Sequence, residues 1–326
     1  IFFRSKMPSR PARVCAVVAL FLSLALMWSA VFVTIQVRSA EGSIFLHRQK
    51  ARLVISEVSK QLYNALGNAM TATISLSGFI YGSFGQKIHD PGCDQLLMDL
   101  GVRNRPCVNV SQFYNFSQEM VLRFPHIGSL QLQPQAVVTW AWPTTGAIGH
   151  DLLNDPKRRK DVLNTVAKED IVIAGPFNLV QGGFGLIVRF PVWVSGDRNW
   201  DTWWGLVAAL IFVDKLLDDT AHLDDMVLDY YYDLSFYNPN TMTIDLIRKK
   251  VPDAMNLRDK TDDPLGPICQ NVTIRNDALN WEFCLIPKQG WSGEMKVIDW
   301  IVPVALGLAA ALLCLLLGAG IIISSW

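Results

Sequence analysis

The chain has 326 residues, in which 29 Lys and Arg balance 29 Asp and Glu, so its formal net charge at pH 7 is zero. Nucleic-acid-binding proteins depend on an excess of positive charge, so this balance argues against nucleic acid as a partner. Hydrophobic residues make up 51% of the chain and are unevenly spread, and the length allows one or two domains.

Two stretches without any charged residue lie near the two ends, at residues 14–37 and 301–323. Each is long enough to cross about 30 Å of hydrocarbon, so we predict transmembrane helices at residues 14–37 and 299–324. A cleaved signal peptide is the alternative for the first stretch. That stretch is longer than a typical signal-peptide core and lacks a clean small-residue cleavage site, which favours a spanning helix.

Basic residues set the expected orientation. Those before the first stretch are Arg4, Lys6, Arg10 and Arg13. By the positive-inside rule they place residues 1–13 in the cytoplasm, which makes residues 38–299 extracellular. We therefore expect the protein in the plasma membrane or another cell-surface membrane, with membrane lipid as one of its partners.

Four cysteines lie between the two predicted spans, at Cys93, Cys107, Cys269 and Cys284. An even number in an oxidising compartment predicts disulfides, although four cysteines allow three connectivities. We expect Cys93–Cys107, because these two are close in sequence within one predicted loop region. We also expect Cys269–Cys284, because they lie seven residues either side of a predicted two-residue turn at 276–277.

Three tripeptides match the acceptor pattern for N-glycosylation, at Asn109, Asn115 and Asn271. All three fall in the part of the chain that is predicted to be extracellular. Such tripeptides also arise by chance, so the pattern only favours a eukaryotic source.

A long helix is predicted directly after the first span, because residues 38–80 contain no proline and repeat apolar residues at spacings of three and four. This face contains Ala51, Ile55, Val58, Leu62, Ala65, Ala69, Thr73, Leu76 and Ile80. Two interpretations remain open for it. The face packs onto its own domain, or it forms the seam of a homodimer in which Ala65 and Ala69 allow close approach.

Residues 38–90 hold this stalk and the start of the ectodomain, and residues 91–213 form a membrane-distal module. We expect a loop over 78–105, a helix over 111–123 and strands within 128–142. Asp155 and Pro156 begin a helix that runs to about Lys168, with Asp as N-cap and Pro at the first helical position. The three strands that follow are expected at 171–180, 185–194 and 205–213.

Residues 214–298 are expected to form a linker helix and a smaller, membrane-proximal module. An acidic helix over 216–229 leads into a strand over 228–237 and a helix over 241–251. Two further strands, 268–275 and 278–286, form a hairpin. Strands and helices in this order predict an α+β fold.

The sequence offers little chemistry for catalysis. The five histidines have no metal-binding spacing, and the chain contains no nucleophile elbow, Walker loop or dinucleotide-binding loop. The glycine cluster after Gln181 joins two predicted strands instead of opening a helix, so a phosphate site there is weakly supported. We therefore expect no metal, no cofactor and no enzymatic activity in this segment.

Three motifs carry a family resemblance, and they span roughly residues 124–212. They are Gly149-His-Asp-Leu-Leu-Asn-Asp-Pro-Lys-Arg-Arg159, Gly175-Pro-Phe-Asn-Leu-Val-Gln-Gly-Gly-Phe-Gly-Leu-Ile-Val-Arg-Phe-Pro-Val192 and Trp204-Gly205. Together they resemble bacterial members of the CHASE family, the extracellular ligand-sensing domains of membrane-bound cyclases and histidine kinases. The resemblance implies two PAS-like modules, a long N-terminal helix that pairs with its twin in a homodimer, and two flanking transmembrane helices. It also implies a cytoplasmic output module beyond residue 326, such as a cyclase, a phosphodiesterase or a histidine kinase.

The resemblance also implies a ligand site. In the plant cytokinin receptors, a branch of this family, the acid at the position of Asp151 hydrogen-bonds the purine ring of the ligand. The main chain at the position of Ile173 and a polar side chain at the position of Gln181 also contact it. This predicts a pocket between residues 149–151 and 171–175. The alternative for Asp151 is a structural carboxylate in a turn.

The ligand class stays open. A purine-like or amine-bearing ligand would suit Asp151, because an ionised carboxylate only accepts hydrogen bonds. The Gln-Gly-Gly sequence at Gln181 departs from the plant pattern, so a small amino acid or carboxylate is the second class. The alternative function is a membrane-anchored scaffold that uses the same fold to bind a partner protein.

Overall fold

The structure is a computed structural model. It describes residues 10–84, 91–180, 182–238, 242–252, 257, 265–274, 279–291, 301–302, 304–309, 312–313 and 316. The chain divides into two compact units, one made of Ile1–Ala51 and Ile286–Trp326 and the other of Arg52–Leu285.

The first unit contains the N-terminal part of α1, a helix that spans Arg10–Phe84. Among the described residues, one helical segment, Leu22–Phe84, is apolar and long enough to cross a membrane, judged by length and composition. The predicted first span, 14–37, lies within α1. The predicted second span lies largely outside the described residues, and those that are described there are helical.

The second unit begins with the rest of α1, which buries one face. From Ile55 to Ile80 every residue of the predicted apolar stripe is at most 1% exposed. His126 fixes this face to the rest of the unit, because its Nε2 atom lies 2.8 Å from the carbonyl oxygen of Ala65. The stripe therefore packs onto its own domain. The homodimer seam predicted at Ala65 and Ala69 is wrong, since the chain itself covers both residues.

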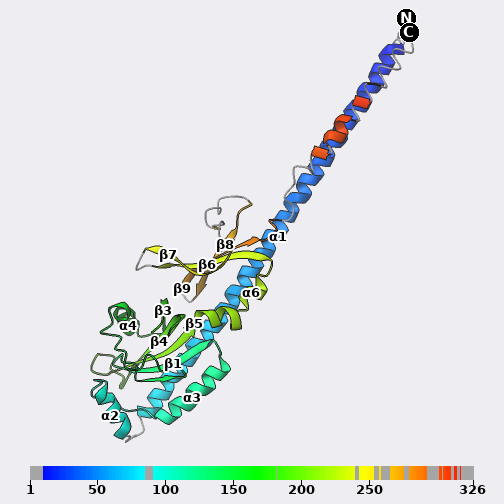
Figure 1. Ribbon diagram of the computed structural model, residues 1–326. Coiled ribbons are helices and arrows are strands. Elements are labelled where there is room, and N and C mark those ends of the chain that lie inside the picture. The colour runs from blue at the N-terminus through cyan, green and yellow to red at the C-terminus, as the bar shows by residue number, and fades with distance from the viewer. Residues whose placement is uncertain are drawn as a thin grey trace. The chain divides into compact units, whose positions relative to one another are not determined.

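A five-stranded antiparallel sheet forms the module that was predicted to be membrane-distal (Figure 1). Its strand order is β2-β1-β5-β4-β3. The strands are β1 (Ile127–Pro134), β2 (Trp140–Trp142), β3 (Val172–Asn178), β4 (Phe184–Trp193) and β5 (Trp203–Phe212). All five lie where strands were predicted from the sequence.

Helices cover the two faces of this sheet differently. On one face lie α1 and α3 (Val110–Arg123): Phe84 of α1 contacts the Trp204 ring, and α3 contacts β1 and β2. On the other lies α4 (Pro156–Lys168), which contacts β3 and β4. As predicted, α4 begins at an N-cap, where the Asp155 side chain accepts a hydrogen bond from the Lys157 backbone at 2.9 Å.

One expectation for this module is wrong. A loop was predicted over 78–105, but α1 continues to Phe84 and a short helix, α2 (Pro91–Asp99), follows. Glycines at 78 and 82 made the first part look irregular. Isolated glycines inside a helix cost only about 1 kcal/mol each, and burial of Ile80 and its neighbours outweighs that cost.

A broken connector replaces the single helix predicted over 216–229. It consists of α5 (Val213–Lys215), the π-helical turn η1 (Leu216–Thr220) and α6 (Leu223–Met226). The break falls at His222, whose backbone φ of 45° lies in the left-handed region and cannot continue a right-handed helix.

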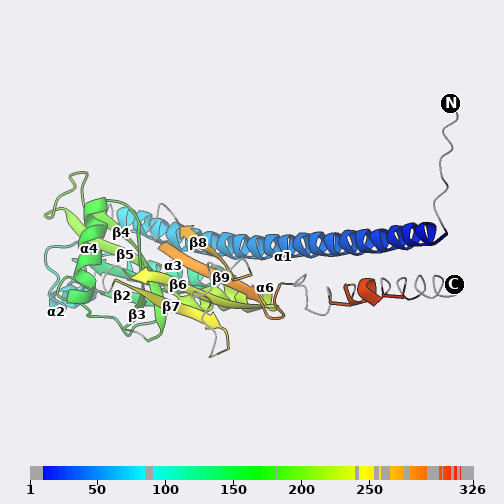
Figure 2. The ribbon, with the colours of Figure 1, turned by 90° about the horizontal axis from the view of Figure 1, so that it is seen from above.

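The module that was predicted to be membrane-proximal is a four-stranded antiparallel sheet with the order β7-β6-β9-β8, drawn in yellow to orange (Figure 2). Its strands are β6 (Tyr230–Asn238), β7 (Thr243–Lys250), β8 (Ile268–Ile274) and β9 (Leu279–Pro287). The helix predicted over 241–251 is wrong, because this segment forms β7. Ile244 and Leu246 alternate with polar residues, and pairing with β6 decides between the two periodicities.

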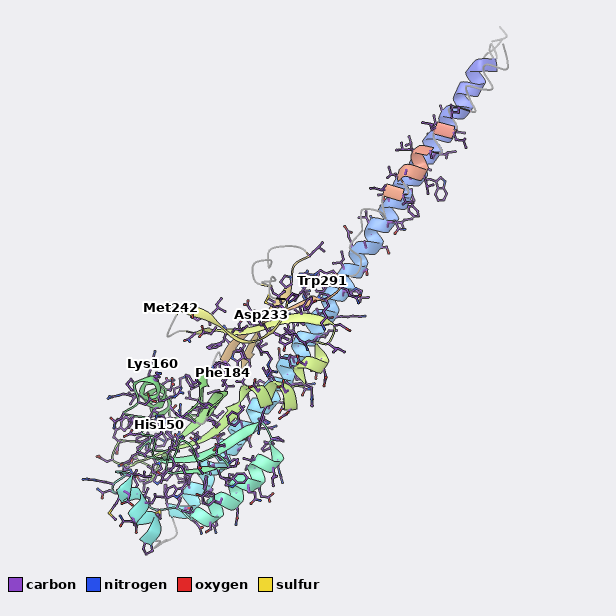
Figure 3. The ribbon with its side chains drawn as sticks, in the orientation of Figure 1. His150, Lys160, Phe184, Asp233, Met242 and Trp291 are labelled. Atoms are coloured by element: carbon purple, nitrogen blue, oxygen red, sulfur yellow. A yellow bond between two sulfur atoms is a disulfide. The ribbon has the colours of Figure 1, made fainter. Side chains whose placement is uncertain are left out.

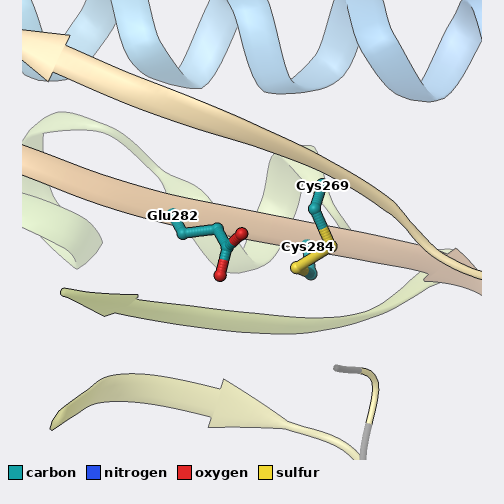
Figure 4. Close-up of side chains that lie close together, drawn as sticks. All are labelled: Cys269, Glu282 and Cys284. Atoms are coloured by element: carbon teal, nitrogen blue, oxygen red, sulfur yellow. A yellow bond between two sulfur atoms is a disulfide. The ribbon is translucent and has the colours of Figure 1, made fainter. Parts of the chain in front are cut away.

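Both predicted disulfides are present. Cys93 of α2 is joined to Cys107, and Cys269 of β8 is joined to Cys284, its direct cross-strand partner on β9. The carboxylate of Glu282 lies close to the second pair (Figure 4). This trio does not make a thiolate metal site, because both sulfur atoms are bonded to each other.

His126 offers a test of the contact between α1 and the sheet. A carbonyl oxygen only accepts, so Nε2 donates to Ala65, and Nδ1 has no partner among the described residues. Burial lowers the pKa of His126, and the bond to Ala65 opposes this shift. The unfolded chain therefore binds this proton more readily. The free energy of unfolding therefore keeps its full value above the ordinary histidine pKa of about 6.5. It decreases as the pH falls from there through the lower pKa of His126 in the folded protein.

We expect the melting temperature to fall between about pH 7.5 and pH 5.5. His126→Gln keeps an N–H donor for Ala65 but removes the titrating group, so its melting temperature should fall less over the same range. Circular dichroism melts of both proteins measure the difference. The same pH dependence in both would show that the buried imidazole does not control the acid sensitivity.

Candidate ligand-binding site

Asp151 serves a turn. Its Oδ1 atom accepts hydrogen bonds from the backbone of Leu153 at 3.0 Å and of Asn154 at 3.1 Å, and its Oδ2 atom accepts one from the Asn154 side chain at 2.7 Å. Its backbone forms an isolated antiparallel bridge with Val137. These bonds shape the segment that leads into α4, which is the structural interpretation of this carboxylate.

Ile173 lies on β3, opposite Val188 of β4, and is 5% exposed. Gln181 lies outside the described residues. Ile173 lines a groove to which Asp151 does not contribute, so ligand contacts of Asp151, Ile173 and Gln181 stay a prediction.

The groove has a volume of about 480 Å³. It is lined by Asp161 and Asn164 of α4, residues 172–177 of β3, residues 236–238 of β6 and residues 279–281 of β9. Its size is within the range of small-molecule sites, about 300–1,000 Å³. Because β3 is the edge strand of its sheet, some of its backbone N–H and C=O groups point away from β4 and can meet a ligand.

Asp161 is the carboxylate of this groove. Burial raises the pKa of Asp161, while the positive charges of Arg189, Arg158 and Lys160 oppose the shift. Ionised, this group accepts hydrogen bonds from a ligand. It lies on α4, the helix that covers the polar row of the sheet described next.

A row of cross-strand partners leads from the groove into the sheet. Val172 of β3 pairs with Arg189 of β4, Arg189 with Ala208 of β5, and Ala208 with Gln131 of β1. Direct partners point to the same face of a sheet. This is the face that α4 covers, because Leu206 of β5 packs in one cluster with Val162 of α4.

Arg189 is a buried charge in this row. It is 1% exposed, and its Nε and Nη1 atoms have no hydrogen-bond partner among the described residues. Burial lowers the pKa of Arg189 to about 10, with Asp161 opposing the shift and Arg158 adding to it. The guanidinium therefore still carries its charge at neutral pH.

Two glutamines lie on the same face. Gln133 donates from Nε2 to Oε1 of Gln131 at 2.8 Å. The remaining donor, Nε2 of Gln131, and the remaining acceptor, Oε1 of Gln133, are buried without a partner within the described part of the chain. The face under α4 thus holds a fixed charge, a free amide donor and a free amide acceptor.

The cluster of Arg189, Gln131 and Gln133 was not predicted from the sequence. The Leu130-Gln-Leu-Gln alternation predicted a strand, and such alternation normally turns its polar side to water. Here both faces of β1 are buried, so Gln131 and Gln133 lie in the interior of the protein. The signal for Arg189 was a single charge inside the apolar strand 185–194.

Residues 108–243 match the family model described as the CHASE domain. The chain contains a CHASE domain. This agrees with the resemblance of its three motifs, and the matched segment covers the distal sheet, the connector and β6. CHASE domains are extracellular sensory domains of membrane receptors, so this segment is an extracellular sensory domain.

Several solved structures also match this chain. One is an extracellular ligand-binding receptor from Desulfohalobium retbaense, with 10% identity, a TM-score of 0.48, and coverage of 72% of this chain and 39% of that one. Another is the ligand-binding domain of a Campylobacter jejuni chemoreceptor in complex with 4-methylisoleucine, with 8% identity, a TM-score of 0.46, and coverage of 76% and 90%. A third is the periplasmic domain of Vibrio cholerae LuxQ, with 8% identity, a TM-score of 0.41, and coverage of 73% and 100%.

This chain thus spans 39% of the length of the Desulfohalobium receptor. The comparison with curated proteins gave no match.

The predicted glycosylation sites differ in their surroundings within the CHASE domain and the second sheet. Asn115 and Asn271 are exposed. Asn109 is half-buried, and its side-chain oxygen caps α3 by accepting from the Gln112 backbone at 3.0 Å. Glycosylation at all three stays a prediction.

Asp151→Ala tests the structural role of this residue. The substitution removes three local hydrogen bonds, so we expect a loss of about 0.5–2 kcal/mol in the free energy of unfolding, the range for lost caps. Chemical denaturation measures this loss. Asp219→Ala, at an exposed aspartate of η1, is the control and should change little. Unchanged stability of Asp151→Ala would contradict the structural role.

Proposed function

We propose that this chain is the sensory part of a membrane receptor, in which the CHASE domain binds a small molecule outside the cell. The observation that carries the proposal is the groove lined by α4 and β3 on one side and by β6 and β9 on the other. It has the volume of a small-molecule site, and it is bordered by strands of both sheets. A ligand in it would contact both modules at once.

Such a position gives the ligand a way to act. A ligand shifts a conformational equilibrium only if it binds one state better than the other. A molecule that bridges β3 and β6 would favour one arrangement of the two sheets. The acidic connector joins the same two modules: Arg248 of β7 forms ion pairs with Asp214 and Asp218. The proposal is therefore a shift between two discrete arrangements of the modules.

The ligand classes expected from the sequence fit different parts of this site. An amine or a purine N–H would be accepted by Asp161 and by free carbonyl groups of the edge strand β3. A carboxylate would need a positive partner, which Arg189 provides one strand further in. In this proposal the ligand pocket includes the groove at Asp161 and β3 as well as the guanidinium of Arg189.

We further propose a homodimer formed through the outer face of α1. This face is opposite to the buried stripe and carries large exposed apolar side chains, with Leu53 at 67%, Tyr63 at 57% and Ile74 at 47% exposure. A second copy of this helix would cover these apolar side chains, as helices that pair in a homodimer do.

The membrane topology belongs to the same proposal. The N-terminus is cytoplasmic, residues 38–299 are extracellular, and two spans cross a cell-surface membrane. The sensory segment has no catalytic role. The output, a cyclase, a phosphodiesterase or a histidine kinase, is carried by a cytoplasmic module.

Binding is tested with the chain 1–326 in lipid nanodiscs and a panel of amino acids, small carboxylates, purines and amines. We expect at least one member to raise the melting temperature. Asn164→Trp fills the groove from an exposed position on α4, so it should weaken this ligand about tenfold or more.

Lys160→Trp is the matched control, because Lys160 is also exposed on α4 but does not line the groove (Figure 3). It should keep the affinity. Equal weakening by both substitutions would place the ligand elsewhere. A panel without any thermal shift would favour the scaffold that binds a partner protein.

The dimer is tested by cysteine cross-linking in membranes. Ile74→Cys and Leu53→Cys lie on the outer face and should form disulfide-linked dimers efficiently. Ala69→Cys, on the buried face, should not, because the chain itself covers this position. Cross-linking at Ala69 that matched the yield at Ile74 would show that the two faces have been exchanged.

A further inference from the structure

We infer that Arg189 is the anchor for a carboxylate on the ligand, with Gln131 and Gln133 as its supporting hydrogen-bonding groups. This inference rests on the proposed sensing function and assigns the ligand class of the same site. It follows from three features of the α4 face, which are the state of the guanidinium, the residues beside it, and its position behind the groove.

The state of the guanidinium is the first feature. A buried charge is costly unless it is paired and hydrogen-bonded. Arg189 has two nitrogen atoms without a partner among the described residues, and an arginine cannot escape the cost by losing its proton at neutral pH. A carboxylate that binds along one edge of the guanidinium would bond Nη2 together with either Nε or Nη1, and would so satisfy one of the two nitrogen atoms.

Arg158 shows that this chain pairs a buried arginine where the role is structural. It is 8% exposed and lies on α4. Its Nη2 atom donates to the carbonyl oxygen of Asn178 at 2.8 Å, and its guanidinium lies 4.1 Å from the centre of the Phe177 ring. Arg189 has no comparable set of contacts. The contrast points to a partner of Arg189 that comes from outside the chain.

The residues beside Arg189 suit a small organic anion. Its neighbour on β5 is Ala208, a small residue that lies between Arg189 and Gln131 in the row of direct partners. Arg189 on β4 and Gln131 on β1 flank β5 and are therefore about 10 Å apart, twice the usual strand spacing, so a ligand that bonds both must lie across Ala208. The free Nε2 donor of Gln131 can bond the ligand at its far end.

The position behind the groove sets the selectivity. Val172, the direct partner of Arg189, lines the groove, and so does Asp161 of α4. A second negative charge on the ligand would meet the Asp161 carboxylate and be repelled. We therefore expect a monocarboxylate to bind better than a dicarboxylate of similar size.

Thermal stability without ligand gives the first test, again with the chain 1–326 in nanodiscs. Arg189→Met replaces an unpaired buried charge by an apolar side chain of similar length, so its melting temperature should equal or exceed that of the wild type. Arg158→Met is the matched control and should lower the melting temperature by about 2 °C or more, because it loses a hydrogen bond. A similar loss in Arg189→Met would overturn the proposal and make Arg189 structural.

Ligand-induced stabilisation gives the second test. The probes are acetate, butyrate and L-leucine, each compared with its amide, and succinate as the dicarboxylate. At least one monocarboxylate should stabilise the wild type, its amide and succinate should be about tenfold weaker or more, and Arg189→Met should abolish the effect. No carboxylate-dependent shift in the wild type, or an equal shift in Arg189→Met, would overturn the proposal.

The outcome separates this inference from the sensing function itself. A neutral or cationic ligand that depends on Asn164 at the groove, but is unaffected by Arg189→Met, would keep the sensing function and overturn the carboxylate anchor. A chain that no probe stabilises would count against both proposals.

Discussion

The CHASE-containing unit depends on the burial of one face of α1. A helix with a continuous apolar stripe is stable in one orientation only when the chain covers that stripe. Here the stripe from Ile55 to Ile80 is fully covered within the chain. Three contacts then hold one face of the distal sheet against the helix. They are Phe84 with Trp204, Tyr81 with the backbone of Trp193, and Ala65 with His126.

This constraint assigns roles to both faces of the sheet. Because α1 and α3 occupy one face, the polar residues of β1 and β4 must lie under α4 or not be buried at all. Arg189 is buried under α4, and its cross-strand partner Val172 lines the groove, so the groove is the side from which we propose that a ligand reaches it.

Much of the fold could be predicted from the sequence because its signals were local. Each of these signals depends on nearby residues. They are the hydrophobic runs that form the strands, the N-cap at Asp155, and the spacing of Cys269 and Cys284 about a turn. The structure also explains one glycine of the motifs. Gly205 follows Trp204 in the third motif, and a Cβ atom there would lie 2.2 Å from the carbonyl oxygen of Gln133.

The wrong predictions concern segments whose structure depends on residues far away in the sequence. Periodicity shows that a helix face is buried but not what covers it, so Ala65 and Ala69 could not be assigned to packing or to a dimer seam from the sequence. The segment 243–250 has a weak apolar pattern, and only pairing with β6 makes it a strand. Asp151 was named by a family pattern, while its local hydrogen bonds show a turn.

Arg189 lies beside the strand that connects the two modules along the chain. Arg189 pairs with Ala208 on β5, and β5 runs without interruption into α5 and η1, whose Asp214 and Asp218 hold Arg248 of β7. The first sheet is therefore joined to the second through the strand beside the proposed anchor, as well as through the groove. Packed sheets change between discrete arrangements more readily than they deform. A ligand that neutralises Arg189 and fills the groove would act on both connections at once, so its effect on the membrane-proximal sheet would exceed that of a ligand bound in the groove alone.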